Sequence, residues 1–311
     1  MGSTPQAGDD PLAKERRLIA ALSACERAMV AFSAGVDSTY LLAVAFEVLG
    51  ERVLAVTADS PSLARTSLCE AEDFCRAHGI SHRVLKTDEF ERDEYLANDG
   101  QRCYHCKAAL MRAMLGLARA TDAQRTGTAL LLGAISDDLK DHRPGMAAAA
   151  TAGARFPLAD AGFTKEDVRT RARARGLASW NRPAEPCLSS RVPYGEPVTV
   201  AGLAMIEAAE QLLKEYGFAH CRARHHQVGG GRGRLLRIEV PEGDLGRVLG
   251  ARAQLLPALR ALGYQNVTLD LSGLTSGGFN TLLAPAETTR AEAPAPLVAA
   301  AAAAPTAPSA R

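Results

Sequence analysis

The chain has 311 residues, of which 47% are hydrophobic and 23% are charged, and its formal net charge is +1 at pH 7. This composition is ordinary for a globular protein, and it excludes fibrous and collagen-like chains. The near-neutral charge gives no overall attraction to nucleic acid. No apolar run is long enough to span a bilayer and no signal-peptide pattern is visible, so we expect a cytoplasmic protein with neither nucleic acid nor membrane as a partner.

The two ends of the chain differ in composition from its middle. Residues 1–12 and 285–311 are rich in small residues and proline without apolar periodicity, which predicts disordered tails. Between them we expect a larger domain over residues 13–194 and a smaller α+β domain over residues 195–284.

Strands alternate with helices along the larger region. Apolar runs predict strands at 28–32, 53–56, 82–85 and 129–132, with helices at 39–49, 62–78, 104–119 and 164–175. This alternation is typical of an α/β fold with a doubly wound parallel sheet. Beyond residue 195, a helix near 199–216, a basic strand, a strand over 235–240, another helix and a strand at 267–271 predict the smaller α+β domain.

The segment 33–38 joins the first strand to the first helix. Its sequence Ser-Ala-Gly-Val-Asp-Ser consists mostly of small residues that let the backbone approach an anion. The start of the following helix adds free N–H groups and the positive end of the helix dipole. The sequence therefore predicts a phosphate-binding loop, although the Walker A and Gly-x-Gly-x-x-Gly patterns are absent here.

Two further loops follow strands of the same sheet, at 57–60 and 133–138. In parallel sheets, ligands bind at the carboxyl ends of the strands. Asp37 and Asp138 are candidates for placing Mg²⁺ on phosphates, because Mg²⁺ prefers carboxylates together with phosphate oxygens. The full set of candidate nucleotide-binding residues is Ala31, Phe32, Ser33, Gly35, Val36, Asp37, Ser38, Thr57, Asp59, Ser60, Gly133 and Asp138.

The seven cysteines fall into two groups. Four lie singly in helix-like or strand-like segments and are expected to pack as small hydrophobic residues: Cys25, Cys69, Cys75 and Cys221. Cys103 and Cys106 form a Cys-x-x-Cys pair at a helix start, a position that suits redox chemistry, zinc or an iron–sulfur cluster. Cys187 lies in a proline-rich segment at the domain junction.

That segment, 180–195, reads Trp-Asn-Arg-Pro-Ala-Glu-Pro-Cys-Leu-Ser-Ser-Arg-Val-Pro-Tyr-Gly. It resembles the pattern Trp-Asp-Lys-Pro-Ala-x-Pro-Cys-Leu-Ser-Ser-Arg-x-Pro-Tyr-Gly of the LarE-type ATP-dependent sulfur transferases, which belong to the PP-loop ATP pyrophosphatases. Further matches lie at 55–61, 137–145, 161–169 and 276–280, and together they cover about residues 20–282. The 33–38 loop is similar to the PP-loop pattern Ser-Gly-Gly-x-Asp-Ser.

The chain departs from the family pattern at a few positions. Ala34 replaces the first glycine of the PP-loop, which we expect to be mild because alanine takes little space. Asn181 and Arg182 replace the usual Asp-Lys. Ile135 and Ser136 stand where the family usually has Asn-Ala, so a contact to adenine or ribose is expected to differ there.

The resemblance implies ATP and Mg²⁺ and a defined reaction. A carboxylate of pyridinium-3,5-biscarboxylic acid mononucleotide is adenylated and sulfur then replaces AMP, a step toward the nickel-pincer nucleotide of lactate racemase. In one class of the family, the cysteine that matches Cys187 gives up its own sulfur. In the other class, three cysteines hold a [4Fe-4S] cluster whose unique iron carries the sulfide. Cys103, Cys106 and Cys187 favour the cluster class, and the family often forms homo-oligomers.

A substrate with carboxylates and a phosphate requires cationic groups near Cys187. Arg222 and Arg224 alternate on one face of the basic strand, and Arg191 lies beside the thiol loop. Glu207 and Glu210 on the preceding helix are weaker candidates for metal or substrate contacts. Four histidines, His105, His142, His225 and His226, are expected to be exposed without a function.

Two other interpretations remain open. The chain is compatible with another PP-loop activity, either thiolation of tRNA or amidation as in NAD synthase, although the first would call for a stronger basic face. It is also compatible with a nucleotide-binding regulator that uses the three cysteines as a zinc or redox sensor. Release of pyrophosphate from ATP separates an enzyme from such a sensor.

Overall fold

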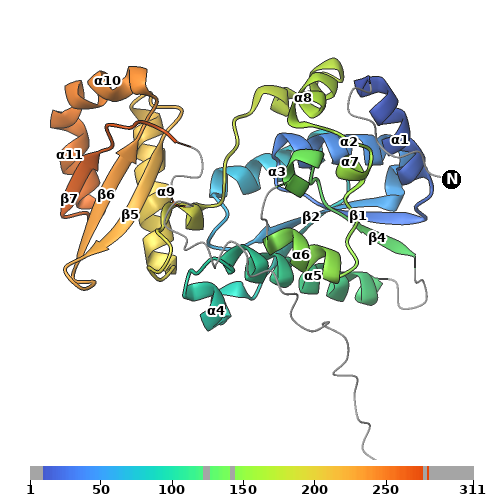
Figure 1. Ribbon diagram of the computed structural model, residues 1–311, viewed down its shortest axis with the longest axis horizontal. Helices are drawn as coiled ribbons and strands as arrows, with labels where there is room; N and C mark the ends of the chain where they lie inside the picture. The colour runs from blue at the N-terminus through green and yellow to red at the C-terminus, as the bar shows by residue number, and fades with distance from the viewer. Residues whose placement is uncertain (1–9, 122–126, 141–143, 276–278, 280–311) are drawn as a thin grey trace, which may run out of the picture.

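The computed structural model describes residues 10–121, 127–140, 144–275 and 279. It has two lobes, each with its own sheet (Figure 1). Several positions that the sequence singled out lie outside the described residues. These are the expected tails apart from residues 10–12, the segment 141–143 with His142, and the 276–280 match apart from Phe279.

The larger lobe is built on a four-stranded parallel sheet with strand order β3-β2-β1-β4. The predicted α/β fold with a parallel sheet and a second, smaller domain is confirmed. The strands are β1 Arg27–Ala31, β2 Val53–Asp59, β3 His82–Lys86 and β4 Thr128–Leu131. The helices are α1 Pro11–Ser23, α2 Val36–Leu49, α3 Arg65–Ala77, α4 Asp93–Leu96, α5 Arg102–Thr121, α6 Pro144–Thr151, α7 Pro157–Asp160 and α8 Lys165–Ala174.

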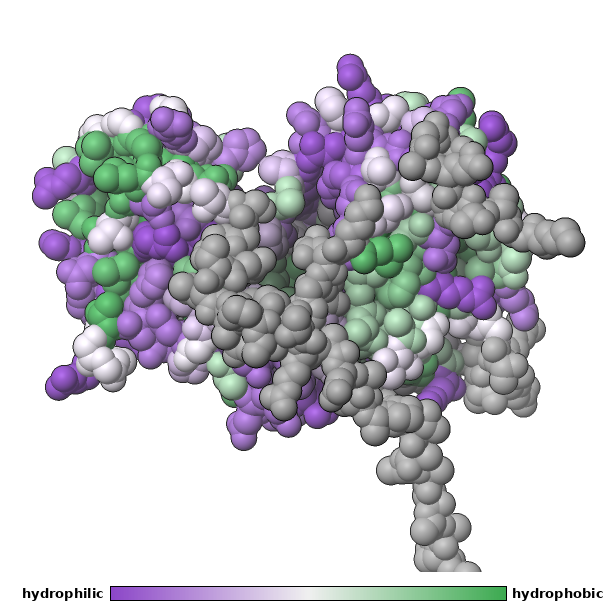
Figure 2. Space-filling view, in the orientation of Figure 1, coloured by the Kyte–Doolittle hydropathy of each residue, from purple (hydrophilic) through white to green (hydrophobic). Residues whose placement is uncertain are grey.

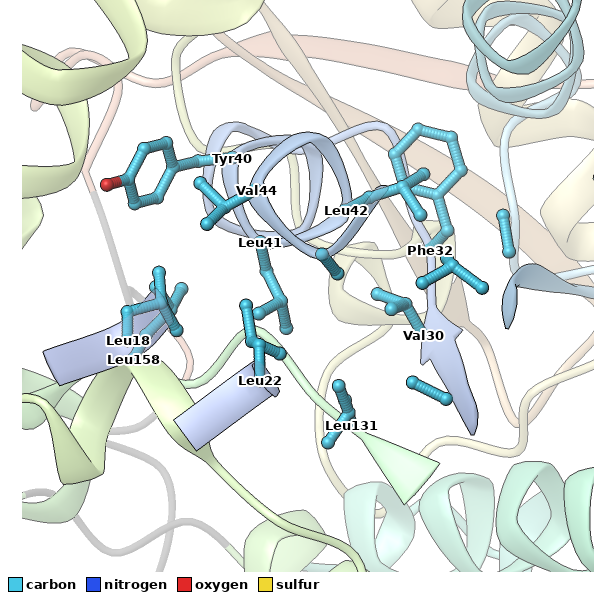
Figure 3. Close-up of a cluster of buried hydrophobic side chains, with 14 of the residues drawn as sticks. Leu18, Leu22, Val30, Phe32, Tyr40, Leu41, Leu42, Val44, Leu131 and Leu158 are labelled. Atoms are coloured by element: carbon cyan, nitrogen blue, oxygen red, sulfur yellow. The ribbon is translucent and has the colours of Figure 1, made fainter. Parts of the chain in front are cut away.

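Helices cover both faces of this sheet (Figure 1). Successive side chains of a strand point to opposite faces, so Ala28 and Val30 of β1 pack with α1, α2 and α8, whereas Met29 packs with α5 and α6. Figure 3 shows Val30 and Phe32 at the right of α2, with Leu18 and Leu22 of α1 below it and to the left. Burial on both faces explains the continuous apolar runs of β1, β2 and β4, whereas the edge strand β3 is largely exposed.

Helix α1 begins inside the stretch 1–12 that the sequence predicted as a disordered tail. It begins at Pro11, and the side chain of Asp10 accepts a hydrogen bond from the Leu12 N–H. An acidic N-cap followed by proline in the first turn is a helix-start signal. Leu18 and Leu22 then anchor the helix, because both are fully buried in the core.

The smaller lobe has a three-stranded sheet with strand order β5-β6-β7. Its elements are α9 Val200–Glu215, β5 Arg222–Val228, β6 Gly233–Glu239, α10 Leu245–Gly250, α11 Arg252–Ala261 and β7 Asn266–Leu269. One face of the sheet packs on α9 and α11 through residues such as Ala223 and Ile238. The other face carries Arg222 and Arg224, in agreement with the predicted alternation. Figure 2 shows hydrophobic surface gathered at the outer end of this lobe.

Short 3₁₀ helices connect these elements: η1 Gly50–Arg52, η2 Glu89–Glu91, η3 Ser136–Lys140, η4 Ala178–Asn181, η5 Leu188–Arg191 and η6 Glu242–Asp244. Several of them lie at the carboxyl ends of strands or at the junction of the lobes. In the part of the chain that the structure describes, no helix is long and apolar enough to cross a membrane.

Asn98 joins the segment before α5 to the segment that follows Cys187. It is completely buried, with a positive φ of 55° that residues other than glycine adopt at a cost. Its side-chain Nδ2 donates to the backbone carbonyl oxygens of Pro193 at 2.7 Å and Glu196 at 2.8 Å. Its backbone carbonyl accepts from the Gly195 N–H at 3.0 Å. Tyr95 packs in the core of the smaller lobe, so a residue far before position 195 also contributes to that core. The domain boundary expected at residue 195 stays a prediction.

We predict that Asn98→Ala lowers the free energy of unfolding by at least about 2 kcal/mol, because buried carbonyl groups lose their donors. Urea denaturation followed by circular dichroism measures the change. Asn181→Ala, at an exposed position, is the matched control and should lie within about 0.5 kcal/mol of the unmodified protein. Equal denaturation midpoints for the two variants would contradict this role of Asn98.

Candidate functional site

One cavity of about 880 Å³ lies at the carboxyl ends of the parallel strands and extends to β5 of the smaller lobe. It brings together three groups that lie far apart in the sequence: the predicted phosphate loop, the three singled-out cysteines and two arginines. Ten of the twelve candidate nucleotide-binding residues line it: Ala31, Phe32, Ser33, Gly35, Asp37, Ser38, Thr57, Ser60, Gly133 and Asp138.

The 33–38 loop forms the start of α2, as predicted. The hydroxyl of Ser38 accepts from the Ser33 N–H at 3.3 Å and donates to the Gly35 carbonyl at 3.1 Å, which braces the loop from within. Ser33 is exposed and its hydroxyl lies 3.2 Å from that of Ser38. The first N–H groups of α2 have no intrahelical partner, so the loop offers donors to an anion.

Ala34 lies in this loop with φ of 56°. The exchange of glycine for alanine was expected to be mild, because alanine takes little space. The structure gives a different reason for glycine at this position, because left-handed backbone costs an L-residue about 1–2 kcal/mol. The Arg182 guanidinium lies 3.3 Å from the Ala34 carbonyl and donates to it, so the 180–195 segment contacts the loop directly.

The end of β4 packs tightly against the loop. A Cβ on Gly133 would lie 2.9 Å from the backbone nitrogen of Ser38, so this position requires glycine. Asp37 pairs with Lys165 at 2.6 Å, and burial raises the pKa of its carboxyl group while Lys165 lowers it. Its Oδ1 is buried without a hydrogen-bond partner, which fits a carboxylate that receives a cation or another donor.

Cys103 and Cys106 line the cavity from the first turn of α5, where residues three apart share one face. Cys187 lines it from the residue before η5, with its carbonyl accepting from the Ser190 N–H at 2.9 Å. The three thiols therefore face one cavity. The sequence resemblance implied such a meeting, and the contacts that produce it could not be read from the sequence.

Arg102 connects the two cysteine segments. Its guanidinium is buried and donates to the Ser189 carbonyl at 2.8 Å and to Oδ1 of Asn98. It forms no salt bridge with any carboxylate among the described residues. Burial lowers its pKa, but the charges of Cys187 and Cys103 outweigh this effect and raise it. Loss of the thiol protons on metal ligation would supply the anions that balance this buried cation.

A triangle of hydroxyl groups supports the Cys187 segment. The hydroxyls of Ser62, Tyr95 and Ser189 hydrogen-bond to one another, at 2.7 Å for Ser62 and Ser189 and 2.8 Å for Tyr95 and Ser189. The carbonyl of Ser62 also accepts from the Leu188 N–H at 2.8 Å. Since Ser62 follows β2, the loop that carries Cys187 is attached to the nucleotide side of the cavity.

The surroundings of the α5 thiols favour the protonated form. Burial raises the pKa of Cys106 to about 12, against a smaller opposing effect of Lys107. Burial and the Cys187 charge raise the pKa of Cys103, and the Arg102 guanidinium lowers it. Cys103 is open to the cavity, yet the nearby protein wall desolvates its sulfur. Ligation of a metal would therefore release protons from these thiols.

The three cysteines were also compared with the ligand grouping of a mononuclear metal site. In residues 10–121, 127–140, 144–275 and 279, no three His, Cys, Asp or Glu side chains are grouped closely enough to hold one ion. A zinc ion needs ligands that converge on a single point. An iron–sulfur cluster takes each thiolate on a different iron, so its ligands are spread farther apart. Three thiols that line one cavity are the donor type that an iron–sulfur cluster takes.

Arg222 and Arg224 reach the cavity from the same face of β5. Arg224 is fixed by Glu239, with two contacts of 2.9 Å, and by the Ser190 carbonyl at 2.8 Å. Arg222 donates to the Thr275 carbonyl at 2.6 Å. Burial and the charges of Arg224 and Arg191 lower the pKa of Arg222. An anion bound beside Arg222 would relieve this repulsion.

Five predicted site residues do not line the cavity, because each packs in the core or pairs with another protein group. Val36 is buried in the core and Asp59 pairs with Arg65 at 2.6 Å. The other three stabilise the junction of the lobes. Arg191 and Glu210 form a buried ion pair at 2.8 Å, and Glu210 also accepts from the Ala223 N–H at 3.1 Å; Glu207 accepts from the Arg65 N–H at 2.5 Å, at the start of α3.

The histidines are also placed by the structure. His225 is buried and its Nδ1 lies 3.2 Å from the Tyr264 hydroxyl, so it differs from the exposed side chain that the sequence suggested. His226 is half-buried, and burial with the charge of Arg237 lowers its pKa to about 4. Neither lines the cavity described above.

Sequence reasoning missed several residues of the cavity wall: Ser62, Thr87, Glu89, Tyr95, Arg102 and Lys107. Two of them carried a usable signal. Thr87 and Glu89 follow the strand 82–86, and the rule that ligands bind at the carboxyl ends of parallel strands applies to that strand as well. Tyr95 and Arg102 gave no such signal, since their positions depend on contacts to distant backbone groups.

Comparisons with known proteins place the chain among relatives of similar length. No family model matches it. The pyridinium-3,5-bisthiocarboxylic acid mononucleotide synthase of Lactiplantibacillus plantarum is 36% identical over 275 residues, which cover 88% of this chain and 96% of that protein. An uncharacterized protein of Synechocystis sp. is 38% identical over 260 residues, 83% of this chain and 93% of its own length. An uncharacterized protein of Methanocaldococcus jannaschii is 23% identical over 246 residues, 79% and 90% of the two chains.

We predict that Ala34→Gly raises the free energy of unfolding by about 0.5–1 kcal/mol, because relief of left-handed strain exceeds the entropy cost of glycine. Urea denaturation measures the change. Ala24→Gly is the control, since Ala24 is exposed with an ordinary φ of −77°, and it should not stabilise the protein. Destabilisation by Ala34→Gly would show that strain at this position is not significant.

We also predict that iodoacetamide alkylates Cys106 at pH 8 at least about tenfold faster in urea than in the folded, metal-free protein. The thiolate is the reactive form, and a raised pKa lowers its fraction at any given pH. Mass spectrometry of the labelled peptides measures both rates. Cys69, which is exposed, should react at similar rates in the two states. Equal folded and unfolded rates for Cys106 would contradict the prediction.

Proposed function

Because the chain belongs to the family of the pyridinium-3,5-bisthiocarboxylic acid mononucleotide synthases, the LarE-type sulfur transferases, we propose that it is an ATP-dependent sulfur transferase. Its substrate would be pyridinium-3,5-biscarboxylic acid mononucleotide, on the route to the nickel-pincer nucleotide of lactate racemase. The observation that carries the proposal is the single cavity that contains the phosphate loop, the three thiols and Arg222. Activation by ATP and delivery of sulfur can then occur without release of an intermediate.

The first step is activation of a substrate carboxylate. A carboxylate oxygen attacks the α-phosphorus of ATP, the bond from that phosphorus to pyrophosphate breaks, and an acyl-adenylate remains. In this step Ser33 and the first N–H groups of α2 would hold phosphate oxygens. Asp37, with its unpaired Oδ1, would place Mg²⁺ on them. Lys165, paired with Asp37, would hold that carboxylate in place.

In the second step sulfur attacks the acyl carbon, a C–S bond forms, and the C–O bond to AMP breaks. AMP is a good leaving group, so the task of the protein is to hold sulfur close to that carbon. Cys187 is suited to this because the next residue, Leu188, donates its N–H to the carbonyl of Ser62, which follows β2 on the nucleotide side. Arg222 would hold a carboxylate or the phosphate of the substrate, because guanidinium groups pair with such anions bidentately.

We assign Cys103, Cys106 and Cys187 as ligands of a [4Fe-4S] cluster. When bound, the cluster would supply an iron without a protein ligand, at which exchangeable sulfide binds. The protein contributes the Arg102 guanidinium, which balances thiolate charge, and the hydrogen bonds that hold the two cysteine segments side by side. The homo-oligomeric state, the cytoplasmic location and the absence of a nucleic-acid partner stay predictions.

We predict about four iron and four acid-labile sulfide per chain in protein purified without oxygen, and their loss in Cys187→Ala. Cys69→Ala, which removes an exposed cysteine away from the cavity, should keep the cluster. On addition of ATP and substrate, the unmodified protein should release pyrophosphate and AMP in equal amounts and place sulfur in the product.

Absence of iron after reconstitution would contradict the cluster assignment. A mass loss equal to one H₂S on turnover would then identify Cys187 as a single-use donor, which becomes dehydroalanine when its C–S bond breaks. Release of pyrophosphate without sulfur in the product would contradict the sulfur-transferase proposal itself. ATP binding with no pyrophosphate release would favour a nucleotide-binding sensor.

A further inference from the structure

Thr87 and Glu89 lie at the carboxyl end of β3 and line the cavity. The Glu89 side chain is 1% exposed. Its Oε2 is buried without a hydrogen-bond partner, and so is Oγ1 of Thr87. Neither residue has a role in the reaction steps described above.

A buried carboxylate without a partner is unfavourable, because its desolvation is not offset. Among the described residues, Glu89 forms no salt bridge and its side chain makes no hydrogen bond. It is nevertheless close to the sulfur centre, since its charge contributes to raising the pKa of Cys106. Natural proteins satisfy most buried polar groups, so an unsatisfied pair on the wall of a cavity indicates that a ligand supplies the missing partners.

The chemistry of the pair restricts that ligand. A carboxylate repels phosphate, and an apolar group would leave Oε2 unpaired. A metal ion would need further protein ligands, and no described group of three acidic, cysteine or histidine side chains supplies them. Neutral hydroxyl and N–H donors remain. A carboxylate and a hydroxyl two residues apart suit two adjacent hydroxyl groups, and in dinucleotide-binding folds an acidic residue beyond a strand binds ribose in this way.

We propose that Glu89 and Thr87 form a subsite for the vicinal diol of a ribose. The inference rests on the proposed function, which brings two ribonucleotides, ATP and the pyridinium mononucleotide, into this cavity. The sheet order places β2 between β1 and β3, so the subsite lies about 10 Å from the phosphate loop in the hydrogen-bonding direction. The sugar of either nucleotide can lie there while its phosphate contacts the loop or Arg222.

The test compares the affinities of the full chain and its variants for ribonucleotides and deoxyribonucleotides, under conditions in which no reaction occurs. Isothermal titration calorimetry gives the Kd of AMP and of 2′-deoxy-AMP and 3′-deoxy-AMP. A second arm uses nicotinic acid mononucleotide and its 2′-deoxy form. The variants are Glu89→Gln, Thr87→Val and, as the matched control, Glu91→Gln, which alters an exposed glutamate of the same 3₁₀ helix.

In one arm, the unmodified protein and Glu91→Gln should bind the ribonucleotide about tenfold more tightly than its deoxy form. Glu89→Gln should reduce this preference to about twofold or less. The arm in which the preference falls identifies the nucleotide whose ribose occupies the subsite. If Glu89→Gln does not fold, Thr87→Val carries the test, because valine matches threonine closely in shape.

A preference that is unchanged in Glu89→Gln and Thr87→Val overturns the subsite, as does equal affinity of the unmodified protein for ribose and deoxyribose ligands. These outcomes leave the proposed function standing. Failure of the unmodified protein to bind either ribonucleotide overturns the subsite and also counts against the proposed function. A Glu89→Gln variant that loses only thermal stability identifies an internal structural role, and this result too overturns the subsite.

Discussion

The candidate site depends on the hydrogen bonds by which Asn98 and Arg102 join two remote segments. Asn98 satisfies carbonyl groups of the loop beyond Cys187, and Arg102 donates to both Asn98 and Ser189. Together with the hydrogen bond between the Tyr95 and Ser189 hydroxyls, these bonds hold the segment before α5 against the segment that contains Cys187. The buried guanidinium of Arg102 also opposes the rise that burial causes in the pKa of Cys103, so it favours the thiolate form that a metal takes. Geometry and electrostatics at the thiol centre therefore have one origin.

The two lobes contribute different chemistry to one cavity. The larger lobe presents N–H donors at the start of α2, which suit phosphate, and the smaller lobe presents a cationic strand. The division is visible in the two arginines of β5. Arg224 is neutralised by Glu239 and orders the Ser190 carbonyl, whereas Arg222 is left in a positive field. A ligand anion is thus directed to one position on that strand.

Much of the fold could be predicted because the signals are local. Strands buried on both faces are continuous apolar runs, and the parallel sheet follows from their alternation with helices. The site could be predicted only in part. Residue type suggested ligand contacts for Glu207 and Glu210, but each is held by a protein group, the Arg65 N–H and the Arg191 guanidinium. Ala34 is a second example: the free-energy cost of alanine at this position comes from its positive φ and not from its volume, and the sequence does not show that angle.

The hydroxyl triangle of Ser62, Tyr95 and Ser189 has a consequence for proton supply. Three hydroxyl groups contain three hydrogen atoms, and a ring in which each donates to the next uses all of them. These three hydroxyls then have no hydrogen left to give to a sulfide or to a departing thiolate. A proton that accompanies the sulfur must come from other polar groups of the cavity, which include Ser190 and Lys107. The triangle therefore holds the Cys187 segment in place without taking part in proton transfer.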